Sequence, residues 1–343
     1  MSTFAGTPAA SSSSVQSAMA THRVKHGPAP LSGLAWLVWR QHRAAFWTLI
    51  ALTVIAVAYM VHQRGQMMDY LNQQGWPHLK SGWDAEFQGY SEQMWTFGEY
   101  LGYAPLLIGV FVGAPLLAGD LETGTAKLVT AQSVSRARWL AAKLGLTALV
   151  VAAVTGVLSA VFGWWWAPVK GRSAELTWNG IFFSTTGIVP VALALLACGM
   201  GAAAGMLLRR TLVSMVVTFG AFMAVRVIWD WWRRGLGQAV TVTSDQGVGP
   251  GAVAPELPAG AVEVGSMDFV TRAGERLDWT TCIGLKEEER FACLESKHVV
   301  GWAMDYVPMQ QMAGLQWLAG GVVLALTAAL TAFVLFWGRR QTV

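Results

Sequence analysis

Long stretches without Asp, Glu, Lys or Arg dominate the pattern of apolar and polar positions along this chain. About 20 apolar residues in a helix, rising 1.5 Å per residue, cross the hydrocarbon core of a bilayer of roughly 30 Å. Each stretch is close to that length or longer, so each predicts a transmembrane helix. The stretches are 44–61, 101–118, 144–169, 176–208, 306–338 and a shorter run, 211–225, which continues through Arg226.

Composition supports the same reading of these stretches. Hydrophobic residues make up 54% of the chain and charged residues 13%, whereas an average soluble domain has roughly a quarter of its residues charged. Several apolar helices buried in one small soluble domain would leave nothing polar to cover them. We therefore predict an all-α polytopic membrane protein with six transmembrane helices, five or seven spans being the alternatives.

The basic residues predict the orientation of the spans. With both termini in the cytoplasm, half of the 24 Lys and Arg residues fall in short cytoplasmic segments next to span ends, and Asp120 and Glu122 are the only acids on that side. Lys and Arg in short loops mark the cytoplasmic face. The expected location is a bacterial plasma membrane. The basic residues are expected to lie at the membrane surface, so no nucleic-acid partner is expected.

These spans divide the chain into five parts. Residues 1–33, rich in Ser, Ala, Thr and Pro, predict a disordered cytoplasmic tail. Residues 34–45 predict an interfacial helix on the inner leaflet, or simply the basic flank of the first span. Residues 46–232 hold spans one to five with a cytoplasmic loop at 119–143, and 62–100 form an external connection. An extracytoplasmic segment at 233–312 separates the fifth span from the sixth, at 313–338.

Local features refine two of these parts. In the fourth span, small residues such as Gly201 and Gly205 allow close approach of helices in lipid, which we expect within one subunit. In the external segment, residues 247–260 predict irregular structure and residues 286–298 a helix, while the fold of the segment as a whole stays open.

The three cysteines separate by location. Cys198 lies in the fourth span and is expected to be a packing residue, whereas Cys282 and Cys293 both lie in the external segment, where oxidation is permitted. Two cysteines allow one pairing, so we predict a disulfide between them. No four-ligand spacing indicates a metal site, and no Gly-Lys dipeptide exists, which excludes a phosphate-binding loop in this chain.

Arg226 and Asp230 lie one turn apart near the outer end of the fifth span. Charge inside a membrane is expensive and is often functional, so this is a candidate outer-gate pair. Near an interface, however, long side chains also reach the headgroups, and a structural role stays open.

A segment around the second and third spans carries a family resemblance. The second span closes with Asp120-Leu121-Glu122-Thr123-Gly124-Thr125, and Gln132-Ser133-Val134-Ser135-Arg136-Ala137-Arg138-Trp139 opens the third. This resembles the bacterial ABC-2 type permeases, the membrane subunits of ABC exporters, in which Glu-x-Glu-x-Gly-Thr precedes Gln-Ser-Val-x-Arg-x-Arg-Trp. Asp120 replaces the first Glu of that pattern.

The resemblance implies a permease subunit that couples ATP hydrolysis in a separate ATPase chain to outward movement of a hydrophobic or amphipathic substrate. It implies a homodimer, no cofactor in this chain, and ATP with magnesium in the partner. The expected coupling residues are Asp120, Glu122, Thr123, Gln132, Arg136 and Arg138.

Other hypotheses remain open at this point. The segment at 119–143 is also compatible with an ordinary basic loop, and the chain with a membrane-anchored sensor or assembly protein whose external segment binds a ligand. An intramembrane enzyme is disfavoured, because no paired catalytic residues stand at helical spacing.

Overall fold

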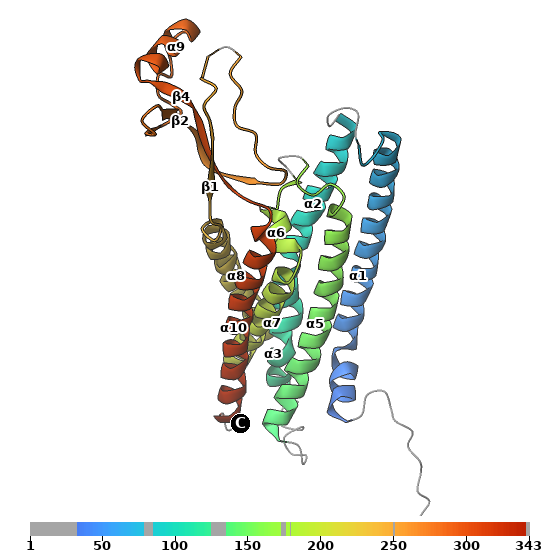
Figure 1. Ribbon diagram of the computed structural model, residues 1–343. Helices are drawn as coiled ribbons and strands as arrows, with labels where there is room; N and C mark the ends of the chain where they lie inside the picture. The colour runs from blue at the N-terminus through green and yellow to red at the C-terminus, as the bar shows by residue number, and fades with distance from the viewer. Residues whose placement is uncertain are drawn as a thin grey trace, which may run out of the picture.

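Six long apolar helices form the body of the protein in a computed structural model (Figure 1). The structure describes residues 33–78, 85–124, 135–172, 176–178, 180–249 and 251–340. Each of these helices has the length and composition to cross a membrane, as predicted. They are α1 (Leu34–Gln73), the continuous series α2 (Ala85–Ile108), η1 (Gly109–Gly113) and α3 (Ala114–Glu122), then α5 (Arg136–Trp166), α7 (Val189–Leu208), α8 (Thr211–Arg234) and α10 (Gln311–Arg340).

The two ends of the helix bundle differ in what they carry. The start of α1 and the end of α10 lie at the same end, together with α3 and the start of α5 (Figure 1). We call this the basal end. A small β domain, defined as residues 235–310, stands at the opposite, distal end. The predicted tail lies outside the described residues except for Gly33.

Two predicted boundaries need correction. Residues 34–45 are the first turns of α1 and do not form a separate helix. The predicted connection at 62–100 is mostly helical, because α1 ends at Gln73 and α2 begins at Ala85. Forty residues give α1 a length of about 60 Å, so it extends well past a hydrocarbon core of roughly 30 Å.

Packing between α1 and α2 explains why these ends stay helical beyond the apolar runs. Leu71 of α1 and Phe87 of α2 are buried, and the rings of Tyr70 and Tyr90 lie 5.6 Å apart. Gln63 donates a hydrogen bond of 2.6 Å to the side chain of Gln93. Tertiary contacts therefore stabilise turns that the hydropathy pattern alone assigns to a loop.

Helix α7 lies at the centre of the bundle, in contact with α2, η1, α3, α5, α8 and α10. Its small residues meet a π-helical turn, η1, in the second span. A Cβ built on Gly113 would lie 2.6 Å from the carbonyl oxygen of Cys198, and one built on Gly205 would lie 2.6 Å from that of Ala114. Only glycine allows this approach, and the predicted packing of Gly201 and Gly205 within one subunit is confirmed.

The predicted fourth span begins with a broken segment. A short helix, α6 (Ile181–Thr185), precedes α7. Thr186 lies between the two helices with extended backbone angles, so its carbonyl takes part in no helical series of hydrogen bonds. The buried side chain of Gln316 in α10 donates to that oxygen instead, at 2.9 Å. A polar side chain from the sixth span thus satisfies a backbone carbonyl at the break in the fourth.

A four-stranded antiparallel sheet forms most of the β domain, whose fold the sequence left open. Its strands are β1 (Val240–Ser244), β2 (Val262–Thr271), β3 (Arg276–Leu277) and β4 (Val299–Val307), in the order β1-β4-β2-β3. The register of β2 against β4 shifts twice, so the simple alternation that would reveal a strand in the sequence is interrupted. The class remains mainly α.

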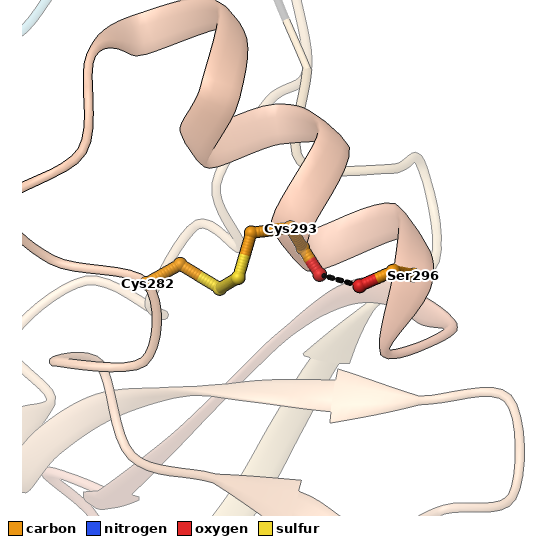
Figure 2. The surroundings of a disulfide bond; sticks show 3 residues. All are labelled: Cys282, Cys293 and Ser296. Carbon is orange, nitrogen blue, oxygen red and sulfur yellow. Dashed lines mark hydrogen bonds between the residues drawn. A yellow bond between two sulfur atoms is a disulfide. The ribbon is translucent and has the colours of Figure 1, made fainter.

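The predicted helix and disulfide of this domain are both present. Helix α9 covers Glu287–Ser296, inside the predicted range. Cys282, in a turn, is joined to Cys293 of α9, and the hydroxyl of Ser296 donates to the Cys293 carbonyl at 2.6 Å (Figure 2). The disulfide therefore holds the turn before α9 against the helix. The third cysteine, Cys198, is buried in α7 as expected.

One face of the sheet carries a charge cluster. Asp305 of β4 accepts a hydrogen bond of 2.8 Å from Arg276 of β3 and another from the hydroxyl of Thr241 of β1. The Arg276 bond, followed by the Thr241 bond, holds the pKa of the Asp305 carboxyl below its usual value. The cluster connects three strands across the sheet.

Candidate functional site

The predicted coupling segment lies at the basal end, between α3 and α5. Its two ends are described, at Glu122–Gly124 and from Ser135 onward. Gln132 lies outside the described residues. Ser135 is the N-terminal cap residue of α5, in extended conformation and without a side-chain capping bond. The site is therefore defined by the residues that hold these two ends in place.

A buried ion pair joins the ends of the segment. Lys143 of α5 pairs with the carboxylate of Asp120 in α3, and the Lys143 side chain is 0% exposed against 8% for Asp120. Lys143 also donates to the carbonyl oxygen of Leu116, at 3.0 Å. From α1, the amide of Gln41 donates to the other oxygen of Asp120. We call Gln41, Asp120 and Lys143 the basal clasp.

The basal clasp is expected to contribute strongly to the stability of the fold, because its ion pair is almost completely shielded from solvent. Removing one partner of a buried ion pair leaves an uncompensated charge and costs about 3–5 kcal/mol. The ring of Trp139, one turn before Lys143 and itself buried, lies 5.0 Å from the Lys143 ammonium. The clasp therefore connects α1, α3 and α5 firmly at the basal end.

Glu122 makes a second connection, to the fifth span. Its carboxylate accepts hydrogen bonds from the backbone N–H of Thr211, at 2.9 Å, and from the Thr211 hydroxyl, at 2.7 Å. Thr211 is the first residue of α8, where backbone N–H groups lack helical partners and favour an anion. Glu122 thus caps α8 from the end of α3, in an exposed position.

The other predicted coupling residues lie around these two connections. Thr123 is exposed, and its hydroxyl donates to the carbonyl of Gly119 at 2.8 Å. Arg138 is exposed and Arg136 half-buried, both in the first turn of α5. The structure therefore divides the predicted set: Asp120 faces inward, whereas Glu122, Thr123 and Arg138 lie at the surface.

The candidate outer-gate residues have different partners. Arg226 donates to the carbonyl of Gly102 in α2, at 3.2 Å, and lies 5.9 Å from the ring centre of Tyr103. Asp230 accepts a hydrogen bond of 3.0 Å from Arg233, three residues along the same helix. These contacts attach α8 to α2 through Arg226 and keep Asp230 within α8.

Two members of the basal clasp are absent from the residues predicted as functional. Lys143 is one of the basic residues that predict the cytoplasmic side, and it is the last charge before the apolar run 144–169. A lysine adjoining such a run has no water on one side, which favours a carboxylate partner. Gln41 has no comparable mark in the sequence. In the described part of the chain, no group of three or more His, Cys, Asp or Glu residues is placed to hold a metal ion.

Six long apolar helices define a multi-pass helical membrane protein. Contacts between the spans gather where a short loop joins the second span to the third. Residues 50–234 match the family described as ABC-2 membrane transporter related. The chain belongs to this family, and it is a permease component of the ABC transporter type. The match extends from α1 to the end of α8, so the β domain and α10 lie beyond it. Comparisons with curated proteins and with solved structures found no match.

Proposed function

We propose that this chain is the membrane-spanning subunit of an ATP-driven exporter, in which a separate ATPase chain docks at the basal end. The transported molecule is hydrophobic or amphipathic and moves outward. Family membership supports the permease role. The observation that carries the coupling role is that both ends of the segment 119–143 are attached to other spans, through the basal clasp and through the Glu122 cap.

These attachments give a route from a docked partner to the membrane. A partner that displaces the segment acts on α3 and α5 directly, because they are its two ends. Asp120 and Lys143 keep these helices together, Gln41 adds α1, and Glu122 adds the start of α8. The basal clasp therefore holds three spans together, and Glu122 attaches the start of α8 to them, whereas an unattached loop would absorb the displacement.

The two connections differ in strength. The basal clasp is buried and is expected to persist through a transport cycle. The Glu122 cap is exposed, so solvent screens its charge and the contact is weaker than the clasp. We propose that this weaker contact opens and closes, so that docking changes how α8 is held. Arg136 and Arg138 are proposed to meet lipid phosphates, where each basic side chain contributes about 1 kcal/mol.

Glu122 provides the test of coupling. Glu122→Ala removes both acceptor oxygens, whereas Glu122→Gln keeps one oxygen for Thr211 and removes the charge. Each variant is purified with its ATPase partner, reconstituted, and assayed for assembly and for transport-linked ATP hydrolysis. Glu256→Ala, an exposed acid of the β domain, is the matched control and is expected to behave as wild type.

The outcomes distinguish the roles of the acid. Loss of coupling in Glu122→Ala with retention in Glu122→Gln supports the cap as the coupling contact. Loss in both variants supports a charged contact with the partner. Wild-type assembly and hydrolysis in Glu122→Ala would overturn the coupling role, and an isolated native complex without any ATPase chain would overturn the transporter.

We further propose that both termini are cytoplasmic, in a bacterial plasma membrane, and that the transporter holds two copies of this chain. The clustering of Lys and Arg near the basal end supports this orientation. An impermeant thiol reagent added outside cells should label a cysteine introduced at Gly251 but not one introduced at Gln341. Labelling at 341 from outside would reverse the orientation.

A further inference from the structure

The β domain differs sharply in charge from the rest of the chain. Residues 235–310 contain eleven Asp and Glu residues against five Lys and Arg, a net charge of −6, although the whole chain carries +4. A surface that carries mainly one sign of charge attracts ligands of the opposite sign and raises their local concentration. The domain is therefore an acidic module on a basic membrane protein.

The turn before α9 exposes three large apolar side chains. Trp279 is 48% exposed, Ile283 55% and Leu285 45%. We call these three residues the apolar tip. The disulfide at Cys282 holds this turn beside α9, which lies at the far end of the β domain from the helix bundle (Figure 1). A lipid bilayer around the spans does not reach this position, so lipid contact does not account for the exposure.

The turn that carries the apolar tip has a defined shape. The backbone N–H of Thr281 bonds the carbonyl of Asp278 at 2.8 Å, and that of Ile283 bonds the carbonyl of Thr280 at 2.9 Å. Together with the disulfide, these bonds fix the backbone before any ligand arrives. A surface already held in its binding conformation loses little entropy when it binds.

Acidic side chains lie next to the apolar tip. Glu287, Glu288 and Glu289 form the first turn of α9, two residues after Leu285, and all three are exposed. They stabilise the N-terminus of the helix, and they outnumber the adjoining Lys286 and Arg290, so this end of the domain carries a net negative charge. A ligand that covers the apolar tip therefore meets carboxylates at its edge.

We propose that the apolar tip and the adjoining glutamates bind cationic amphipathic peptides. Apolar side chains of the peptide cover Trp279, Ile283 and Leu285, and its Lys or Arg residues meet the three glutamates. Contact between the tips of two copies would bring like charges together, which is unfavourable. An anionic membrane surface is disfavoured for the same reason. The partner chemistry that satisfies both the apolar and the acidic parts is a basic, amphipathic peptide.

The inference rests on the proposed orientation, which places the β domain outside the cell, and it extends the proposed function by naming a ligand class. Its test needs neither the ATPase nor transport. A failure to bind peptide would leave the coupling experiment on Glu122 unaffected, so the two proposals fail independently.

The test measures binding of a fluorescent peptide to the full chain in nanodiscs of zwitterionic lipid. The probe is an amphipathic helix of Leu and Lys, and empty nanodiscs provide the lipid background. Binding is expected to weaken on raising the salt from about 0.01 M to about 0.3 M, because exposed charges are screened. The first variant, Glu287→Gln with Glu288→Gln and Glu289→Gln, should weaken binding about tenfold or more.

A matched variant separates local from overall charge. Asp245→Asn, Glu256→Gln and Glu263→Gln remove the same three charges from exposed positions elsewhere in the domain, and binding should change less than about threefold, as screened distant charges predict. A third variant replaces each residue of the apolar tip with Ser and should abolish saturable binding. Mass spectrometry should find the Cys282–Cys293 disulfide intact in each variant, which confirms that the β domain is folded around the turn.

Four results would overturn the inference. One is equal binding of an uncharged peptide with the same apolar pattern, and another is equal weakening by the two charge variants. The third is no binding above that of empty nanodiscs. Self-association of the full chain through the apolar tip, seen as loss of a dimer in the Ser variant, would assign the surface to a second copy and would also overturn it.

Discussion

The buried pair of Asp120 and Lys143 gives the strongest quantitative prediction. Lys143→Met removes the charge but keeps an unbranched apolar side chain of similar length, and Asp120→Leu does the same for the carboxylate. Because the two side chains are 0% and 8% exposed, each single variant leaves a charge without a partner in a nearly dry site. Each is expected to lower the free energy of unfolding by about 3–5 kcal/mol.

The double variant should behave differently from the sum of the single ones. With both charges replaced by apolar groups, the site no longer contains an uncompensated ion, and stability should return to within about 1 kcal/mol of wild type. Gln41→Leu is the matched control, because it removes a hydrogen bond to Asp120 without leaving a net charge. It should cost about 1.5–3 kcal/mol, the usual contribution of a hydrogen bond to a charged group.

Stability is measured by unfolding in mixed micelles at increasing SDS fraction, followed by helical circular dichroism. Hydrogen bonds between membrane helices contribute about 0.6 kcal/mol on average, so a loss of about 3–5 kcal/mol in the single charge variants would indicate an ion pair and not one hydrogen bond. Additive single effects below about 1 kcal/mol each would refute the view of the clasp as a desolvated ion pair, and with it the rigid connection of α3 to α5.

Three other predictions concern packing, pH and oxidation. Gly205→Ala places a methyl group 2.6 Å from a carbonyl oxygen of α3 and should lower thermal stability by about 1–3 kcal/mol, whereas Gly220→Ala, with open space around it, should be neutral. Because the folded β domain lowers the pKa of Asp305 through the arginine of β3 and then a threonine, its stabilising effect is present above the unfolded pKa and is lost as pH falls through the folded one. Acid unfolding of Asp305→Asn should therefore depend less on pH below about 4. Replacing Cys282 and Cys293 with Ser should destabilise the β domain by about 2–3 kcal/mol, and free thiols at both wild-type positions would contradict the disulfide.

Several parts of this protein follow from the sequence because they depend on local pattern. A charge-free run of about 20 residues has few stable alternatives to a membrane helix, and all six spans were predicted in this way. The pairing of Cys282 with Cys293 follows from two cysteines in one external segment. Close packing through Gly201 and Gly205 follows from the small size of the residues, although the helix that they meet does not.

Other parts depend on contacts between residues far apart in the chain, and only the tertiary structure decides them. The sheet of the β domain pairs β1 with β4, and its register shifts remove the alternation that marks a strand. Asp120 and Glu122 stand two residues apart in one acidic motif, yet Asp120 is buried against Lys143 and Glu122 is exposed at α8. A helix turns by about 100° per residue, so these neighbours face different helices. Which face is buried depends on how α1, α5 and α8 pack around α3, and local sequence carries no record of that arrangement.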